Sequence, residues 1–208
     1  ILYISDEVVT SFGRLGHFFS SEEIFGIIPD IITTAKGITS GYMPLGAVLF
    51  SDKLMEDVKK ASSVFIHGYT YSGHPACCVA ALKNIEIIKR DKILEHVQNI
   101  GPYFQKKLNK LIDIPIVGDV RGMGMMTGIE CVMNKKSKEA LVLDQAIGNR
   151  IDEESLKLGL IIRPLYHVCV LSPALIITKK QIDDLAEKLS LAITNAMKKV
   201  EAEGLWSE

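Results

Sequence analysis

An acidic side chain and a lysine near the start of the chain have the types and settings needed for covalent chemistry on a carbonyl group. Asp6 follows the apolar run ILYIS, which predicts a short strand, and open α/β sheets bind ligands at the carboxyl ends of their strands. Lys36 lies in TTAKGITSG, a segment of small residues that favours turns over a long helix. A neutral lysine amine can attack a carbonyl carbon, and a carboxylate can hold a proton on a group that it contacts.

This pair of residue types is what an enzyme dependent on pyridoxal phosphate (PLP) requires. The lysine forms a Schiff base with the cofactor aldehyde, and the carboxylate keeps the pyridine nitrogen protonated so that the ring accepts electrons. We expect burial and neighbouring positive charge to lower the pKa of Lys36, because only its neutral amine is a nucleophile. Plainer interpretations exist for each residue alone: Asp6 as a loop or cap carboxylate, and Lys36 as a solvated surface group.

Three longer stretches of sequence, the first with Asp6 and the second with Lys36, make the interpretation of this pair more specific. They read ISDEVVTSFGRLGHFF, PDIITTAKGITSGYMPLGAV and HGYTYSGHPACCVAAL, in that order. They resemble the class III (omega-amino acid:pyruvate type) branch of the fold-type I PLP-dependent aminotransferases, and the resemblance covers nearly the whole chain. It implies an α/β fold with two parts: the C-terminal part of a large domain built on a mixed, mostly parallel sheet, and a small C-terminal α+β domain. It also implies PLP as the cofactor.

The resemblance gives roles to individual residues of the first half. It makes Asp6 the partner of the pyridine nitrogen and Lys36 the Schiff-base lysine. Val8 takes the place of a residue that packs against a face of the cofactor ring, which suits a stiff β-branched side chain. Thr70 takes the place of a threonine that reaches the cofactor phosphate of the neighbouring subunit, which implies a homodimer with shared active sites. A surface turn with the Thr70 hydroxyl capping the next helix is the alternative.

Arg163 is the candidate for binding a substrate carboxylate, because a guanidinium group offers a planar fork of donors. In ornithine-type relatives the substrate arginine takes the place that Val170 has here. In the omega-amino acid and amine:pyruvate group it precedes a proline, as Arg163 precedes Pro164. A surface arginine paired within the small domain is an equal alternative. Val9 also departs from the ornithine type, which commonly has glutamine there.

The resemblance therefore implies an aminotransferase (transaminase). It would move an amino group from an omega-amino acid, amino acid or primary amine to a keto acid such as pyruvate. An aminomutase or decarboxylase of the same family is one alternative, since these enzymes differ mainly in substrate residues upstream. A non-catalytic dimerisation or binding module is the alternative from another class. The identity of the amino donor does not follow from these residues.

Composition argues against several other classes. The 208 residues are 48% hydrophobic, enough for a core in one or two domains. The formal net charge of -1, without a charge run, gives no support for a nucleic-acid partner. No apolar stretch approaches the roughly 18 residues of a membrane span. The four cysteines lack metal-ligand spacing, so we expect no metal and predict buried free thiols. With no targeting segment visible, we expect a cytoplasmic location.

Local sequence patterns predict the strands and helices that position the candidate residues of the first half of the chain. Ile1–Ser5 is predicted to be a buried central strand of a parallel sheet, and GAVLFS a second strand. The sequence SSEEIF resembles a capping box at a helix start. Asp52–Lys60 predicts an amphipathic helix, and Pro75 predicts the first turn of another. Because Ile1 begins directly inside an apolar strand, we expect the chain to be the C-terminal portion of a longer polypeptide.

The second half has a different pattern. A helical break is expected near Gly101-Pro102, and the domains are predicted as residues 1–102 and 103–208. The second domain reads strand, strand, helix, strand, strand, helix, which predicts a small α+β domain. Thr178 is expected to cap the last helix.

Overall fold

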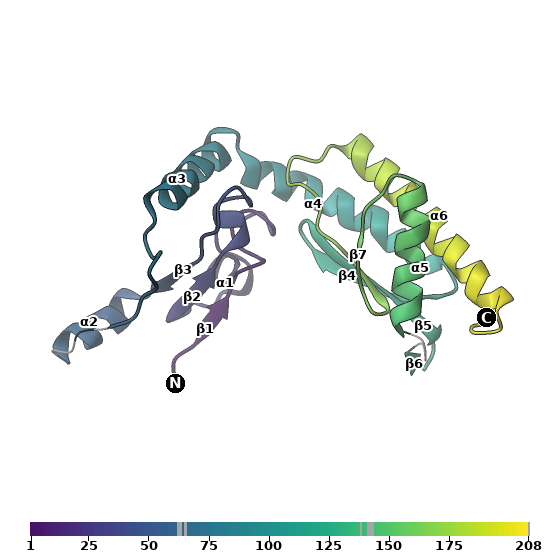
Figure 1. The fold of residues 1–208 in the computed structure, drawn as a ribbon, viewed down its shortest axis with the longest axis horizontal. Helices are drawn as coiled ribbons and strands as arrows, with labels where there is room; N and C mark the ends of the chain where they lie inside the picture. The colour runs from purple at the N-terminus through teal and green to yellow at the C-terminus, as the bar shows by residue number, and fades with distance from the viewer. Residues whose placement is uncertain (62–63, 65, 138, 141–143, 208) are drawn as a thin grey trace. The chain divides into compact units, whose positions relative to one another are not determined.

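The computed structural model describes residues 1–61, 64, 66–137, 139–140 and 144–207. It divides into two compact units, Ile1–Val97 and Gln98–Glu208 (Figure 1). The division lies inside helix α4 (Ile93–Asn109), as does the predicted domain boundary at residue 102. Each unit is described by itself below.

A three-stranded mixed sheet with the order β1-β2-β3 forms the centre of the first unit (Figure 1). Its strands are β1 (Ile4–Asp6), β2 (Ile31–Thr34) and β3 (Ala47–Phe50). β1 runs parallel to β2, whereas β3 runs antiparallel to it. The prediction of a buried central strand over Ile1–Ser5 is wrong for this chain. Among the described strands β1 pairs with β2 alone, so it is an edge strand of this sheet, and Ile4 is 57% exposed.

Helical segments accompany this sheet in the described part of the unit. They are α1 (Ser20–Phe25), the 3-10 turn η1 (Lys36–Ile38), α2 (Asp52–Lys60) and α3 (Pro75–Arg90). The prediction for α2 is confirmed at both ends, and so is the start of α3 at its proline. The core of the unit packs an aromatic ring and the η1 turn against α3; its buried members are Phe12, Ile38, Ala81 and Ile88.

The second unit contains an antiparallel sheet with the order β4-β5-β8-β7 and a short strand β6 that pairs with β5. Its strands are β4 (Val117–Met123), β5 (Met126–Asn134), β6 (Glu139–Ala140), β7 (Arg163–Leu165) and β8 (Val168–Leu171). Apart from the added β6, this is the predicted order of strands and helices. One face of β5 is buried, through Thr127, Ile129 and Cys131. The intervening residues form the opposite face of the sheet.

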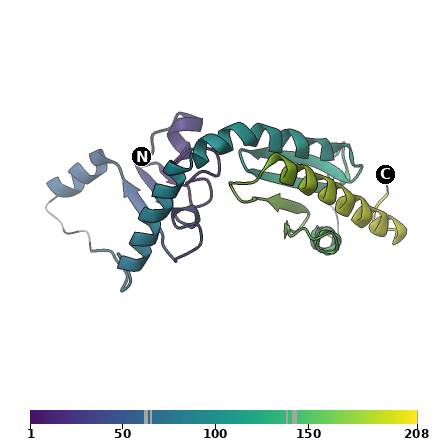
Figure 2. The same ribbon diagram turned by 90° about the horizontal axis from the view of Figure 1, so that it is seen from above.

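Helices α4, α5 (Asp144–Lys157) and α6 (Lys179–Ala202) complete this unit (Figure 2). Thr178 caps α6 as predicted, and Gln181 completes a reciprocal capping box with it. On α4, Tyr103 donates a hydrogen bond of 2.7 Å to Asp183 of α6. Each helix therefore has a defined neighbour within the unit.

The break expected near Gly101-Pro102 is absent, since α4 continues through both residues. The helix passes very close to the β4–β5 turn. A Cβ atom on Gly101 would lie 3.3 Å from the Cα of Gly124. Gln105 also donates hydrogen bonds to the carbonyl oxygens of Gly124 and Met126, at 2.9 and 3.1 Å. These tertiary contacts hold the segment helical although proline removes one helical hydrogen bond.

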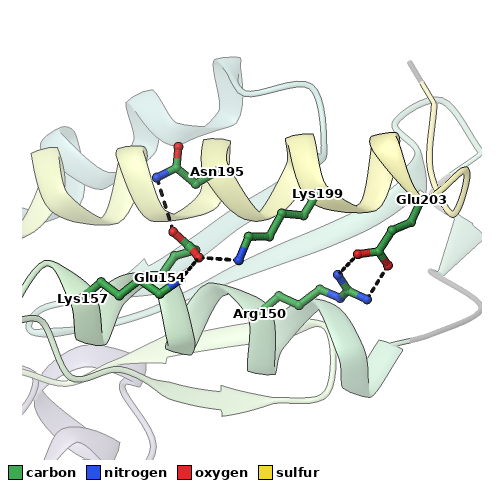
Figure 3. Close-up of polar contacts among 6 residues, drawn as sticks. All are labelled: Arg150, Glu154, Lys157, Asn195, Lys199 and Glu203. Carbon is green, nitrogen blue, oxygen red and sulfur yellow. Dashed lines mark hydrogen bonds and ion pairs between the residues drawn. The ribbon is translucent and has the colours of Figure 1, made fainter.

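A buried carboxylate joins α5 to α6 (Figure 3). Glu154 accepts hydrogen bonds of 2.6 Å from both Lys157 and Lys199, and its side chain is only 8% exposed. One turn away along both helices, Arg150 forms a bidentate ion pair with Glu203 at 2.8 and 2.7 Å. Two charged contacts thus fix the register between these helices.

Candidate active site

Asp6 and Lys36 follow neighbouring parallel strands to the same edge of the first sheet. In the register of β1 and β2, Asp6 lies beside Thr33, and Lys36 begins the turn that follows β2 at Thr34. Carboxyl ends of parallel strands are where open α/β sheets bind ligands. The structure therefore brings together the two residues whose chemistry was predicted to be linked.

Lys36 has an unusual backbone conformation. Its φ angle is 39°, in the left-handed region that residues other than glycine rarely adopt. Such strain is found where the surrounding structure imposes it, often at functional sites. The side chain is exposed, so the predicted burial of Lys36 is not provided by this chain.

The Asp6 carboxylate is only partly used. Its Oδ1 atom accepts hydrogen bonds from the Val8 amide at 3.1 Å and from the Thr33 hydroxyl at 3.3 Å. Among the described residues, Oδ2 has no hydrogen-bond donor. Asp6 is thus oriented through one oxygen and can accept a donor from a ligand at the other. Val8 is half-buried directly beside it.

Glu7, next to Asp6, fixes the loop that follows β1. The residue is 2% exposed, and its carboxylate accepts hydrogen bonds from the Ser20 and Ser21 amides at 2.6 and 2.9 Å. These amides begin α1, so Glu7 caps this helix from a distance. The capping box predicted for SSEEIF is wrong: the N-cap residue is Phe19, whose side chain accepts no hydrogen bond.

A second polar link joins the loop after β1 to the end of β2. Ser11 donates a hydrogen bond of 2.6 Å to the carbonyl oxygen of Glu7, and its hydroxyl also bonds to the buried Thr34 hydroxyl. Thr34 precedes the Lys36 turn. The strand ends that carry Asp6 and Lys36 are therefore held together by buried hydrogen bonds.

Thr70 lies in an exposed turn ahead of α3. Among the described residues its hydroxyl makes no hydrogen bond, so it does not cap the helix in this structure; the N-cap residue is His74. Thr70 remains a candidate for contact with a ligand or a second subunit.

Arg163 begins β7 in the second unit and is exposed. No described carboxylate forms an ion pair with it. In the ladder, Arg163 is the direct partner of Val170 on β8. Cross-strand partners have Cβ atoms about 5 Å apart on one face of the sheet. The two positions considered for a substrate arginine are therefore neighbours, and an arginine at either one would serve the same region.

The cysteines are free thiols in the structure. Burial raises the pKa of Cys169 to about 12 and raises the pKa of Cys131 well above its ordinary value. Both thiols therefore stay protonated near neutral pH and are poor nucleophiles. Within the described residues, no cluster of three or more His, Cys, Asp or Glu side chains is arranged to hold a metal ion.

Sequence reasoning missed two residues of this site. No role was predicted for Glu7, whose partners Ser20 and Ser21 lie 13 and 14 residues away, or for Asn84, since an asparagine inside a helix belongs to no motif. Asn84 donates a hydrogen bond of 2.8 Å to the Gly37 carbonyl, beside Lys36. Its sequence separation of 47 residues leaves no local signal.

Comparison with known proteins gives a consistent family assignment. The family model described as Aminotransferase class-III matches residues 1–193. A putrescine–pyruvate aminotransferase from Pseudomonas aeruginosa is 42% identical over 186 residues, which are 89% of this chain and 40% of the relative. A probable gamma-aminobutyrate transaminase, mitochondrial, from Oryza sativa subsp. indica is 38% identical over 93% of this chain and 38% of the relative.

Solved structures agree with the sequence matches. An (S)-enantioselective omega-transaminase from Thermomicrobium roseum superposes with a TM-score of 0.89 at 40% identity, over 95% of this chain and 44% of the other. A PLP-bound aminotransferase mutant from Vibrio fluvialis gives 0.89 at 35% identity, over 96% and 45%. The chain thus spans about two fifths of the length of the curated relatives that it matches. No helix in the described part of the chain has the length and apolar character needed to cross a bilayer.

Proposed function

The chain belongs to the class-III aminotransferases, and we propose that it carries the catalytic lysine and carboxylate of a PLP-dependent transaminase. The observation that carries the proposal is the placement of Asp6 and Lys36 at the ends of adjacent parallel strands. The α/β fold, with its mixed and antiparallel sheets, agrees with the structures of known transaminases.

The residues present fit the cofactor. When bound, PLP supplies an electrophilic aldehyde and a ring that accepts the electrons released when a substrate C–H bond breaks. Lys36 offers an exposed amine for the aldehyde. Asp6 offers an oxygen without a donor among the described residues, which matches a protonated ring nitrogen. Val8 would pack against the ring, and the Thr70 hydroxyl would donate to a phosphate oxygen.

Each side chain then has a defined task. Asp6 holds a proton on its ring partner by charge and by hydrogen bonding, and Glu7 keeps the loop after Asp6 in place. Lys36 would hold the cofactor through Nζ between reactions. With substrate bound, the free Nζ amine would accept a proton from the substrate carbon and, as the ammonium, would donate that proton again.

The names of the relatives and the position of Arg163 support a substrate class. The putrescine–pyruvate and gamma-aminobutyrate enzymes are named for donors with a terminal amine. We propose a donor of this class and a keto acid acceptor such as pyruvate, whose carboxylate Arg163 binds. The exposed guanidinium, with no described ion-pair partner, supports this role.

The proposal extends to the assembly. A threonine that serves a neighbouring subunit's phosphate requires a homodimer with shared sites, and Thr70 is exposed in its turn as this requires. We further propose that residues 1–102 belong to the large cofactor domain and that residues 103–208 form the small domain.

The test is to reduce the purified protein with borohydride after adding PLP and to map the modified peptide. We expect a pyridoxyl group on Lys36 and loss of both the adduct and alanine formation from pyruvate in Lys36→Ala. A wild-type protein that takes no adduct would contradict the proposal and favour a non-catalytic module. An adduct without amino transfer would favour a mutase or decarboxylase of the same family.

A further inference from the structure

The Lys36 turn is held by a side chain from a distant helix. Asn84, half-buried on α3, donates through its amide nitrogen to the carbonyl oxygens of Gly37 and Ile38 at 2.8 and 3.1 Å. Its amide oxygen accepts a hydrogen bond of 2.8 Å from the Ser40 hydroxyl. One side chain therefore makes three hydrogen bonds to the residues that follow Lys36.

The opposite side of the turn is closed by packing. A Cβ atom on Gly37 would lie 2.8 Å from Cβ of Phe12 and 3.2 Å from the carbonyl oxygen of Ser11. The turn is therefore pressed against the loop after β1 on one side and tied to α3 on the other. Ile38 anchors it further in the buried cluster that includes Ala81 of α3.

These contacts account for the strained backbone of Lys36. The left-handed conformation persists only where the surroundings impose it, because an unrestrained lysine returns to an ordinary φ angle. Within the turn, the Ile38 amide bonds to the Ala35 carbonyl at 3.0 Å, whereas the bonds from Thr39 to Lys36 and from Ser40 to Gly37 are longer, at 3.4 and 3.3 Å. Asn84 adds bonds of 2.8 and 3.1 Å to the carbonyl oxygens of Gly37 and Ile38.

We propose that Asn84 is a positioning residue for Lys36: through the Gly37 and Ile38 carbonyls it fixes the left-handed turn that directs the lysine amine. This inference rests on the proposed function, because it concerns how the amine meets its aldehyde. Asn84 itself touches neither substrate nor cofactor in the proposal. It affects the rate at which the amine reaches a reactive geometry, and not the affinity for the keto acid.

The test compares Asn84→Ala and Asn84→Asp with Lys83→Ala in the holoenzyme. Lys83 is the exposed neighbour on the same helix and pairs only with Glu86 among the described residues. We expect both Asn84 variants to lower kcat by roughly tenfold or more, since small displacements of a reacting group are costly, while KM for the keto acid stays within about twofold. Asn84→Asp should be the worse variant, because its carboxylate faces two carbonyl oxygens.

A second readout separates positioning from general stability. In the apoenzyme, we expect Asn84→Ala to slow the borohydride-trapped attachment of PLP to Lys36 and to speed amide exchange at residues 38–40, and Lys83→Ala to change neither. Attachment and exchange at wild-type rates in Asn84→Ala would overturn the inference. If the wild type takes no adduct at all, the proposed function fails, and the exchange rates alone then decide whether Asn84 holds the turn.

Discussion

At the scale of single residues, Asp6 and Glu7 show how neighbouring carboxylates take opposite tasks. Successive residues at a strand end point to opposite sides. Glu7 points inward, where the amides that begin α1 and the Ser21 hydroxyl satisfy its charge. Asp6 points outward, and its Oδ2 atom has no hydrogen-bond donor among the described residues. Glu7 thus stabilises the loop, whereas the Asp6 carboxylate keeps one oxygen available to accept a hydrogen bond.

Asp6→Asn is predicted to retain PLP and to lose most of its turnover. A neutral amide can still contact the ring nitrogen, but it does not stabilise a proton there, so the ring accepts electrons poorly. We expect kcat to fall by at least about 100-fold, in line with the loss of a charged partner at a reacting group. Steady-state kinetics and the visible absorbance of the bound cofactor measure the two effects. Normal turnover would contradict the assigned role.

At the scale of helices and strands, the α5–α6 contact predicts a specific pH dependence. The hydrogen bonds and charges of Lys157 and Lys199 lower the pKa of Glu154 to about 2. The pKa of glutamate in an unfolded chain is about 4.3. The ionised Glu154 therefore stabilises the native state above that pH, and this contribution is lost as the pH falls toward 2. Glu154→Gln should therefore be less stable than the wild type at pH 7, and the difference should shrink between about pH 4.3 and 2.

Urea unfolding at several pH values measures this difference. Glu153→Gln is the matched control, because Glu153 lies beside Glu154 on the same helix but is exposed. A constant stability difference across the acid range would show that Glu154 does not contribute through its charge.

Because Arg163 and Val170 are cross-strand partners, an arginine at either position should bind the keto acid carboxylate. Arg163→Val should raise KM for the keto acid roughly 10- to 100-fold, the range expected for losing a charged hydrogen bond. Adding Val170→Arg to that variant should recover part of the loss, because the new side chain starts from the neighbouring position on the same face. Val168→Arg is the control, because Val168 lies two residues before Val170 on the same face of β8. Equal recovery by both would mean that net charge alone matters.

The same elements show what the sequence could and could not predict. Helix α2, the proline at the start of α3 and the Thr178 cap have local signals, and all three were predicted correctly. The continuous helix through Pro102 was missed because the stabilising contacts come from the β4–β5 turn. Of the candidate site, the motifs suggested Asp6 and Lys36, whose roles stay predictions. The residues that hold them in place act across long sequence separations and were not predicted.

At the scale of the whole molecule, sharing of sites between subunits can be tested by mixing inactive variants. If Thr70 serves the partner's site, a dimer of one Lys36→Ala and one Thr70→Ala subunit contains one doubly damaged site and one intact site. Random re-association should then restore about a quarter of the wild-type activity, since half of the dimers are hybrids with one good site. Subunit mixing followed by an amino-transfer assay measures it. No recovery despite exchange of subunits would contradict a shared site.

The pairing of β5 with β8 also has a consequence for how the second unit folds. The β4–β5 and β7–β8 hairpins each close over a short turn, whereas Ile129 and Cys169 become neighbours only after the whole segment containing α5 is enclosed. Closing a long loop has an entropic cost that must be met before its contacts form, so non-local pairings limit folding rates. The two hairpins should therefore form early and independently, and the joining of β5 to β8 should set the speed at which this unit becomes native.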